Sequence, residues 1–311
     1  MYIYNGTGAM CGSYAFAQAL AGLDKCLHWL EMSSGASFGI ASLGGKFGFS
    51  RILTVFRDFS SGIDSSASLF GINIERKDFG SPYEAARVLF ALGEGECAVC
   101  GPVNMSLLSY LPLSYQYRAA DHFITFRREK LLHVSDSEGV SAFCISSCEE
   151  LASMLSVKDV PEAEGRITLR KLSRNAGHVY SFGNVLAQIM RAAAENMCGA
   201  ENCGQGSGAF EAISKITADT KPVKWSVPLS INLGHYQYRK YLAGMLIHAV
   251  NEQKIARVPE KLHALLHEAV HNAGMLRFAV RRKNYKAIGE LLMILSAIEK
   301  ETASYIEKVK T

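Results

Sequence analysis

The sequence predicts a mixed α+β domain with an antiparallel sheet over residues 1–172, followed by an all-helical domain over residues 173–311. A chain of 311 residues is long for a single hydrophobic core and suits two domains. The first part mixes helical segments with short runs of strand-forming residues. In the second part apolar residues recur at spacings of three and four, for example at Leu291, Leu295 and Ile298, which is typical of helices.

The composition narrows the class of protein. Hydrophobic residues make up 49% of the chain and charged residues 20%, as in an ordinary globular protein. A net charge of +4 is too small to indicate a nucleic-acid partner. The sequence shows neither a signal peptide nor an apolar run of membrane-spanning length, so we expect a cytoplasmic protein with no membrane partner. In that reducing compartment the eight cysteines should be free thiols rather than a disulfide framework.

Caps and stops mark the helices of the first part. Residues 11–21 are rich in alanine and suit a helix that stops at Gly22. A capping box that begins at Ser81 predicts a helix over residues 82–92, because a proline at the first helical position and a glutamate two residues later both favour a helix start. A second capping box, at Ser147, predicts another short helix.

Strand candidates occupy residues 96–103, 122–127, 131–136, 140–145 and 166–172. The second and third of these flank the polar turn Arg128–Lys130 and predict a hairpin. Before them, the glycine-rich run Ser33–Ser50 indicates a loop or a closely packed turn region.

The all-helical part is predicted from amphipathic stretches near residues 182–197, 207–218, 236–252, 260–273 and 284–309. The region 217–234 between two of them is predicted to be rich in loops.

Cys11 stands in the most informative stretch of the chain, the run Met10–Phe16. A cysteine followed by Gly-Ser and then an aromatic residue resembles the nucleophile segment of the papain-like cysteine enzymes. In that class the cysteine begins a long helix, where the partial positive charge of the helix end favours the nucleophilic thiolate. The alternative is a small buried cysteine at the start of a helix.

A thiol nucleophile needs a base, and the base needs an acceptor that orients it. His122 begins one strand of the predicted hairpin and Asp136 ends the other, and pairing around the turn places the two residues opposite each other. The carboxylate on one ring nitrogen would leave the other free to face Cys11. The chain order of cysteine, histidine and aspartate is also the papain-like order. The alternative for this pair is an ordinary surface contact between histidine and aspartate.

An oxyanion hole needs hydrogen-bond donors aimed at the developing negative charge. The backbone N–H of Cys11 is the natural first donor. Papain-like enzymes add a glutamine side chain six residues before the cysteine, and this chain has Asn5 there, with the same amide on a shorter stem. Thr7 and Ser13 are alternative donors.

Three further segments carry a closer family resemblance. The run Gly101–Pro112, the segment Asp121–Ile124 and the glycine-rich Phe38–Gly48 together resemble the butirosin biosynthesis protein H-like family, which is related to papain-like and bacteriocin-processing peptidases. The resemblance covers about residues 1–160, and the helical part is similar to the family's C-terminal domain in pattern only.

The resemblance implies a cysteine-dependent acyltransferase of antibiotic or other secondary-metabolite biosynthesis, including nonribosomal peptides. Cys11 would take an acyl group from a phosphopantetheine thioester on a carrier protein and pass it to a small amine, which forms an amide. His122 would be the general base and acid, and Asp136 its orienter. No cofactor of its own is implied, because the carrier-protein substrate supplies the phosphopantetheine. The partners implied are an acyl or peptidyl carrier protein and an amine acceptor, and a homodimer is a candidate assembly.

Other readings of the chain stay open. The same triad would serve a cysteine peptidase or thioesterase, and a chain without activity would be a module that binds carrier proteins. The run from His267 through Glu268 to His271 matches the H-E-x-x-H pattern of zinc hydrolases, and Glu290 lies at the spacing of a third ligand. Against this, an amphipathic helix with histidines on one face explains the same letters, and we expect no metal site.

Two smaller features have ordinary explanations. Cys97 and Cys100 lie three apart in a strand-like run and so face opposite ways, which argues against structural zinc. The basic cluster between Arg277 and Lys286 is either a solvated helix face or a surface that docks an acidic carrier protein.

Overall fold

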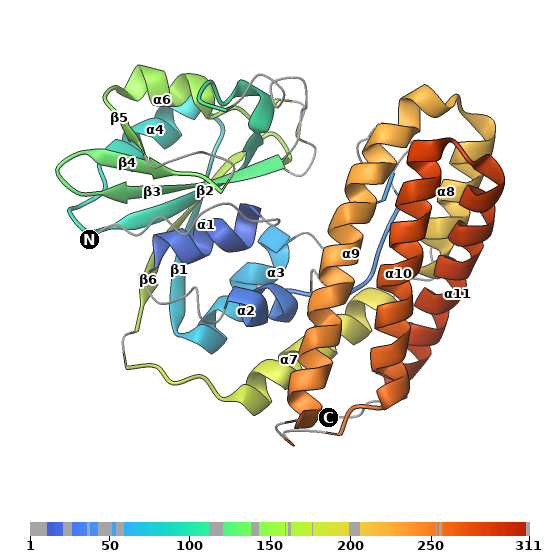
Figure 1. Cartoon of the computed structure of the whole chain (residues 1–311). Coiled ribbons are helices and arrows are strands. Elements are labelled where there is room, and N and C mark those ends of the chain that lie inside the picture. Colours follow the sequence, from blue (N-terminus) through green and yellow to red (C-terminus); the bar gives the residue numbers. More distant parts are fainter. Residues whose placement is uncertain are drawn as a thin grey trace. The chain divides into compact units, whose positions relative to one another are not determined.

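The computed structural model describes thirteen stretches of the chain, and contacts divide the chain into two compact units (Figure 1). One unit comprises Met1–Leu30 with Asp64–Tyr180, and the other comprises Glu31–Ile63 with Ser181–Thr311. The described residues are 11–20, 27–35, 38–42, 52–53, 59–111, 121–137, 143–158, 160, 163–175, 177–198, 206–252, 254 and 257–308.

The first unit is built on a six-stranded sheet in the order β1-β6-β2-β3-β4-β5, in which all neighbours are antiparallel. Together with the helices this confirms the predicted α+β class. The strands are β1 (Ile72–Phe79), β2 (Cys97–Asn104), β3 (Asp121–Arg128), β4 (Leu132–Ser135), β5 (Phe143–Ile145) and β6 (Ile167–Arg174).

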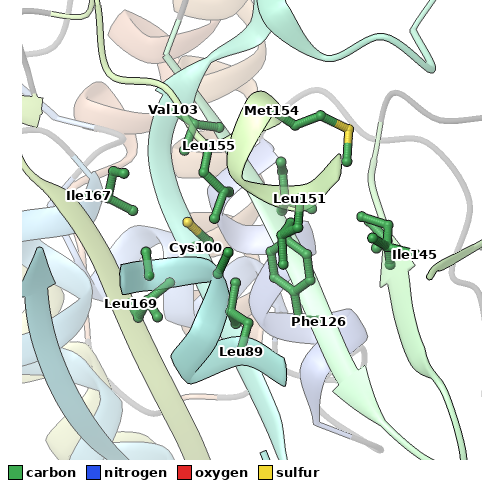
Figure 2. Close-up of a cluster of buried hydrophobic side chains, with 14 of the residues drawn as sticks. Leu89, Cys100, Val103, Phe126, Ile145, Leu151, Met154, Leu155, Ile167 and Leu169 are labelled. Carbon is green, nitrogen blue, oxygen red and sulfur yellow. The ribbon is translucent and has the colours of Figure 1, made fainter. Parts of the chain in front are cut away.

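Helices cover the sheet of this unit, with α4 (Pro82–Phe90) and α6 (Cys148–Met154) on one side and α1 (Cys11–Ala19) on the other (Figure 1). The core under α4 and α6 joins strand residues such as Cys100, Phe126 and Leu169 to Leu89 and Leu151 of these helices (Figure 2). All five of these residues are at most 4% exposed, so this face of the sheet is dry. The short helices η3 (Ala67–Phe70) and η4 (Met105–Leu107) connect elements of the same unit.

Both predicted helix starts are confirmed, each with its serine as the N-cap. The Ser81 hydroxyl accepts a hydrogen bond from the Glu84 backbone N–H at 3.5 Å, and the Ser147 hydroxyl accepts one from Glu150 at 3.1 Å. Each bond satisfies an N–H group that the first turn of a helix leaves without an intrahelical partner. The predicted stop of α1 at Gly22 lies outside the described residues.

Strand β1 was not predicted, because its sequence lacks an apolar alternation. Most of its side chains are exposed, and only Ile72 and Phe79 at its two ends are buried. It lies at one edge of the described sheet and pairs there with β6 alone. Charged residues on such an edge strand protect it from pairing with other chains. The strand predicted at 140–145 is β5, and residues 140–142 lie outside the described part.

The second unit is helical, which confirms the predicted helical C-terminal region. Its long helices are α7 (Phe182–Cys198), α8 (Ser207–Asp219), α9 (Pro222–Glu252), α10 (Glu260–Arg282) and α11 (Tyr285–Lys308). The shorter α2 (Leu27–Ser33) and α3 (Phe59–Ser66) span the boundaries between the units. Among the described residues, no helix combines the length and the apolar character that crossing a membrane requires.

The prediction that residues 217–234 are rich in loops is wrong, since α8 extends to Asp219 and α9 begins at Pro222. Trp225, Leu229 and Leu233 lie one turn apart and are buried in the core of the unit. Pro222 is at the first position of the helix, where its ring is tolerated, and Pro228 lies inside the helix.

Part of the glycine-rich run packs against α7 in this second unit rather than in the first domain that the sequence suggested. The Asn196 side-chain amide donates to the backbone oxygens of Gly35 at 2.8 Å and Phe38 at 3.3 Å. Gly39 has φ +75°, and a Cβ atom there would stand 2.5 Å from the Asn196 carbonyl oxygen. A side chain therefore does not fit, which explains the glycine. Residues 36–37 and 43–50 of the run lie outside the described part.

Candidate active site

Cys11 is the first residue of α1 and is partly exposed, with a free thiol. The backbone N–H groups of a first helical turn have no partner within the helix, and they point along the axis with the positive end of the helix dipole. Cys11 is thus partly open to solvent, and it lies where a negative charge on sulfur or on an attacked carbonyl oxygen is favoured.

Strand β3 fixes the position of α1. The Thr125 hydroxyl donates to the Ala15 carbonyl oxygen at 2.7 Å, and the Arg127 guanidinium donates to that of Ala19 at 2.9 Å. A cation at the C-terminal end of a helix also interacts favourably with its dipole. Because His122 lies on the same strand, β3 fixes the position of the imidazole relative to the helix that carries Cys11.

His122 lies near the start of β3, beside an irregularity in β2. The register between the two strands shifts between Cys100 and Val103, and Val103 then pairs with His122. At Gly101 a Cβ atom would stand 2.7 Å from the His122 carbonyl oxygen and 2.5 Å from the Phe123 ring. Only glycine allows this close approach, which brings the backbone of His122 against β2.

Arg170 supports the irregular segment of β2 through a hydrogen bond. Its side chain is 1% exposed, and it donates to the Gly101 carbonyl oxygen at 3.1 Å and to Asp64 at 2.9 Å. The buried guanidinium is therefore both paired and hydrogen-bonded, as a buried charge must be.

Asp136 directly follows β4, and the hairpin brings it to His122 in a register that differs from the predicted one. Thr125 pairs with Ser135, whereas the predicted register pairs Thr125 with His133. The difference is two residues, because the turn is centred on Lys130 and not on Glu129 as predicted. Since side chains alternate faces with a period of two, an even shift keeps Asp136 on the same side of the ladder as His122.

The structure brings Cys11, His122 and Asp136 together. His122 Nε2 lies 2.7 Å from Asp136 Oδ1, and both residues are 1% exposed. The imidazole also forms a hydrogen bond with the Cys11 side chain. Because Asp136 occupies Nε2, Nδ1 is the nitrogen left for the thiol. Burial by itself lowers the pKa of His122, but the hydrogen bonds with Asp136 and Cys11 outweigh it, so that the pKa lies well above its usual value.

Tyr110 belongs to the same network and was missed from the sequence. Its hydroxyl donates to Asp136 Oδ2 at 2.5 Å, the carboxylate oxygen that His122 does not use. Burial, the charge of Asp136 and this hydrogen bond raise the pKa of Tyr110 well above its usual value, so the hydroxyl stays protonated. Tyr110 lies 26 residues before Asp136, and its place in the family-like run Gly101–Pro112 was the one signal that marked it.

The predicted oxyanion donors are only partly described. Asn5 and Thr7 lie outside the described residues, and Ser13 is fully buried in α1. The backbone N–H of Cys11, at the start of α1, is the donor candidate that the described residues contain.

In the segment that matches the zinc-hydrolase pattern, the histidines pair differently from the pairing of His267 with His271 that the pattern suggests. His267 pairs with His263, one turn earlier on α10, with the two Nε2 atoms 3.2 Å apart. Within the described stretches, no ring contact joins His271 to His267, and no three or more His, Cys, Asp or Glu side chains gather so as to hold a metal ion. The geometry of a catalytic H-E-x-x-H zinc site is thus not formed by these residues.

The other described thiols differ from Cys11 in their surroundings. Cys97 and Cys100 are buried, and burial raises the pKa of both, that of Cys100 to about 12. Cys144 is exposed, with its sulfur 3.5 Å from His133 Nδ1, and Cys148 is partly exposed at the start of α6. Cys144 is therefore the thiol to control for in any labelling of Cys11.

A surface hollow of about 560 Å³ lies at the turn end of the β3–β4 hairpin and is lined by charged residues that include Arg127, Glu129 and Lys130. His122 lies at the other end of β3, and none of the three triad residues lines the hollow.

A scan against protein-family models and a search of curated proteins each found no match for this chain.

Proposed function

We propose that the protein is a papain-like cysteine acyltransferase that moves an acyl group from a thioester on a carrier protein to an amine. The observation that carries the proposal is the contact of His122 with both Cys11 and Asp136. A thiol, an imidazole and a carboxylate in that order are the parts of an activated cysteine nucleophile. The order of the three residues in the chain and the start of α1 at Cys11 support the papain-like assignment.

The first half-reaction loads the enzyme. His122 accepts the proton of the Cys11 thiol, and the thiolate attacks the carbonyl carbon of the donor thioester. The backbone N–H of Cys11 stabilises the negative oxygen of the tetrahedral intermediate. When the intermediate collapses, the carbon–sulfur bond to the donor breaks, and His122 returns the proton to the departing pantetheine thiolate. The acyl group is then held as a thioester on Cys11.

The second half-reaction forms the amide. The amine attacks the Cys11 thioester, its proton passes to His122, and the Cys11 thiolate leaves. Exchange of one thioester for another changes the free energy little, whereas conversion of a thioester to an amide is favourable. The reaction therefore needs neither ATP nor a resident cofactor, because the donor brings its own phosphopantetheine.

Burial of the base supports transfer over hydrolysis. His122 and Asp136 are each 1% exposed, so bulk water has little access to the imidazole that would have to activate it. Cys11 is partly exposed and stays open to an acyl donor. An amine that enters with its own binding contacts then competes well against water for the acyl-enzyme.

Intact-mass spectrometry with the acetyl thioester of N-acetylcysteamine, a small pantetheine mimic, tests the proposal. We expect one acetyl adduct on the wild-type chain and on Cys144→Ser, which lacks the exposed competing thiol, and none on Cys11→Ala. Addition of a primary amine such as glycine methyl ester should discharge the adduct as an amide. An adduct that persists in Cys11→Ala would show that Cys11 is not the nucleophile. Release of acetate alone, at the same rate with and without amines, would show that the protein is a thioesterase and not a transferase.

A further inference from the structure

Three histidines gather on two adjacent helices of the helical unit, where α9 approaches its end and α10 begins. His248 comes from α9, and His263 and His267 lie one turn apart on α10. The ring centroids of His248 and His263 are 5.9 Å apart, and those of His263 and His267 are 4.5 Å apart. His248 Nε2 also lies 3.3 Å from Glu252.

The packing of α10 explains why these imidazoles face one another. Leu262, Leu265 and Leu266 are buried on the apolar side of the helix, which leaves His263 half-buried and His267 exposed at its margin. On α9, Gly244 lies beside the His267 ring, since a Cβ atom there would be in ordinary van der Waals contact with the imidazole Nε2, at 3.9 Å. The two rings therefore lie along the seam between α9 and α10.

The separation of the two nitrogens matches that of ligands to one metal ion. His263 Nε2 and His267 Nε2 are 3.2 Å apart. Two zinc–nitrogen bonds of about 2.0–2.1 Å at a tetrahedral angle place their nitrogens about 3.3 Å apart. Nitrogen ligands of the imidazole type suit Zn²⁺, Cu²⁺ and Ni²⁺ rather than Mg²⁺ or Ca²⁺.

We propose that His263 and His267 form a two-imidazole chelate for a divalent transition-metal ion, with water in the remaining positions. With the side chains placed as they are, the described residues supply no third ligand to the same ion. His248, oriented by Glu252, is the imidazole nearest to this pair, so a bound ion would lie beside α9 near its connection to α10. The site is independent of the chemistry at Cys11. It pairs His267 with His263, the preceding histidine of α10, and not with His271, the following one.

Titration of the EDTA-treated and dialysed chain with ZnCl₂ by isothermal calorimetry tests the site. The variants are His263→Ala, His267→Ala and the matched control His271→Ala, which removes a histidine of the same helix from the H-E-x-x-H letters. Cysteine thiols are the same in all four proteins, so any difference between the titrations belongs to the imidazoles. We expect the first two variants to lose at least about tenfold in Zn²⁺ affinity, as metal sites do when a supporting group is removed, while the control binds like wild type.

Thermal unfolding gives a second readout that does not depend on heats of binding. An ion that binds only the folded chain raises the unfolding temperature, by an amount that grows with the logarithm of its concentration relative to the Kd. Zn²⁺ should raise it in wild type and His271→Ala but not in His263→Gln or His267→Gln. Circular dichroism of the two glutamine variants serves as the control for folding. The proposal is overturned if His263→Ala titrates like wild type, or if His271→Ala loses as much affinity as His267→Ala.

Discussion

Tyr110 donates its hydroxyl hydrogen to Asp136 Oδ2 at 2.5 Å, on the oxygen opposite the one that contacts His122. Both oxygens of the carboxylate are thereby engaged, one by a tyrosine and one by the imidazole. Since a carboxylate held at two oxygens cannot rotate freely, Tyr110 fixes the direction in which Asp136 holds His122. Tyr110 is a positioning residue in this arrangement, because it acts through Asp136.

The first prediction concerns Tyr110→Phe. The variant removes a hydrogen bond to a buried carboxylate, which costs about 1–3 kcal/mol of stability. We expect acetylation of Cys11 by the thioester mimic to slow by about tenfold, which corresponds to about 1.4 kcal/mol in the transition state. Time-resolved intact-mass spectrometry measures the rate. Tyr83→Phe, which changes an exposed tyrosine on α4, is the control and should react at the wild-type rate. Equal rates for Tyr110→Phe and wild type would remove Tyr110 from the site.

The second prediction concerns the pH dependence of acetylation and Asp136→Asn. The pKa of His122 is raised despite its burial, by the hydrogen bonds and charges of Asp136 and Cys11. A raised pKa keeps the imidazolium present to a higher pH, so the rate should fall on the alkaline side well above pH 6.5, the usual pKa of histidine. Asparagine keeps a hydrogen-bond acceptor but removes the charge, so the pKa of His122 drops and the alkaline limb moves to lower pH.

Rates of Cys11 acetylation across a pH series measure that shift. Asp78→Asn, on the edge strand β1, changes a carboxylate that hydrogen-bonds Thr168 and Arg76 and should leave the profile where it is. Superimposable profiles for Asp136→Asn and wild type would show that Asp136 does not set the pKa of the base.

The third prediction compares two threonines of the same sheet. Thr125→Val removes the hydroxyl that bonds α1 at Ala15, and Thr168→Val removes one that bonds Asp78 at the same distance of 2.7 Å. Each should lower the free energy of unfolding by about 1 kcal/mol, measured by urea denaturation. Only Thr125→Val should also slow the acetylation of Cys11, because it alone loosens the helix of the nucleophile. A similar effect of both variants on the rate would mean that β3 does not position α1.

Local rules predicted much of the fold because they depend on neighbours in the chain. The caps at Ser81 and Ser147 and the hairpin of β3 and β4 all follow from residues within a few positions of one another. Strand β1 and the first turns of α9 were missed for the opposite reason. β1 is held by pairing with β6 nearly a hundred residues later, and the start of α9 by burial of Trp225 in a distant core.

The candidate site shows the same division between local and distant signals. The contact between His122 and Asp136 tolerates a register error of two residues, because an even shift leaves side chains on the same side of the ladder. Tyr110 reaches Asp136 from outside the hairpin, and no periodicity or spacing links the two. The pairing of His267 with His263 rather than His271 is likewise set by how α10 packs on α9, since both spacings are four residues.

The last prediction concerns a buried ion pair in the helical unit. Lys240 Nζ lies 2.7 Å from Glu299 Oε1, with side chains 2% and 1% exposed, and the Tyr236 hydroxyl donates to the same oxygen at 2.5 Å. Burial and the charge of Glu299 raise the pKa of Tyr236 well above its usual value, so it remains a donor. Lys240→Met would leave a buried carboxylate with one neutral partner, which should lower the free energy of unfolding by about 3–5 kcal/mol.

A matched pair of variants isolates the effect of burial. Lys261→Met breaks the exposed pair with Glu301, at 3.6 Å and nearly half exposed on both sides, and should cost no more than about 1 kcal/mol. The double variant Lys240→Met with Glu299→Gln removes both buried charges and should recover most of the loss, because the penalty belongs to the unpaired charge. In a Trp29→Phe background, Trp225 in the core of the helical unit is the one remaining tryptophan, so its fluorescence in urea follows this unit. If Lys240→Met and Lys261→Met shift the urea midpoint equally, the buried pair contributes no more to stability than an exposed one.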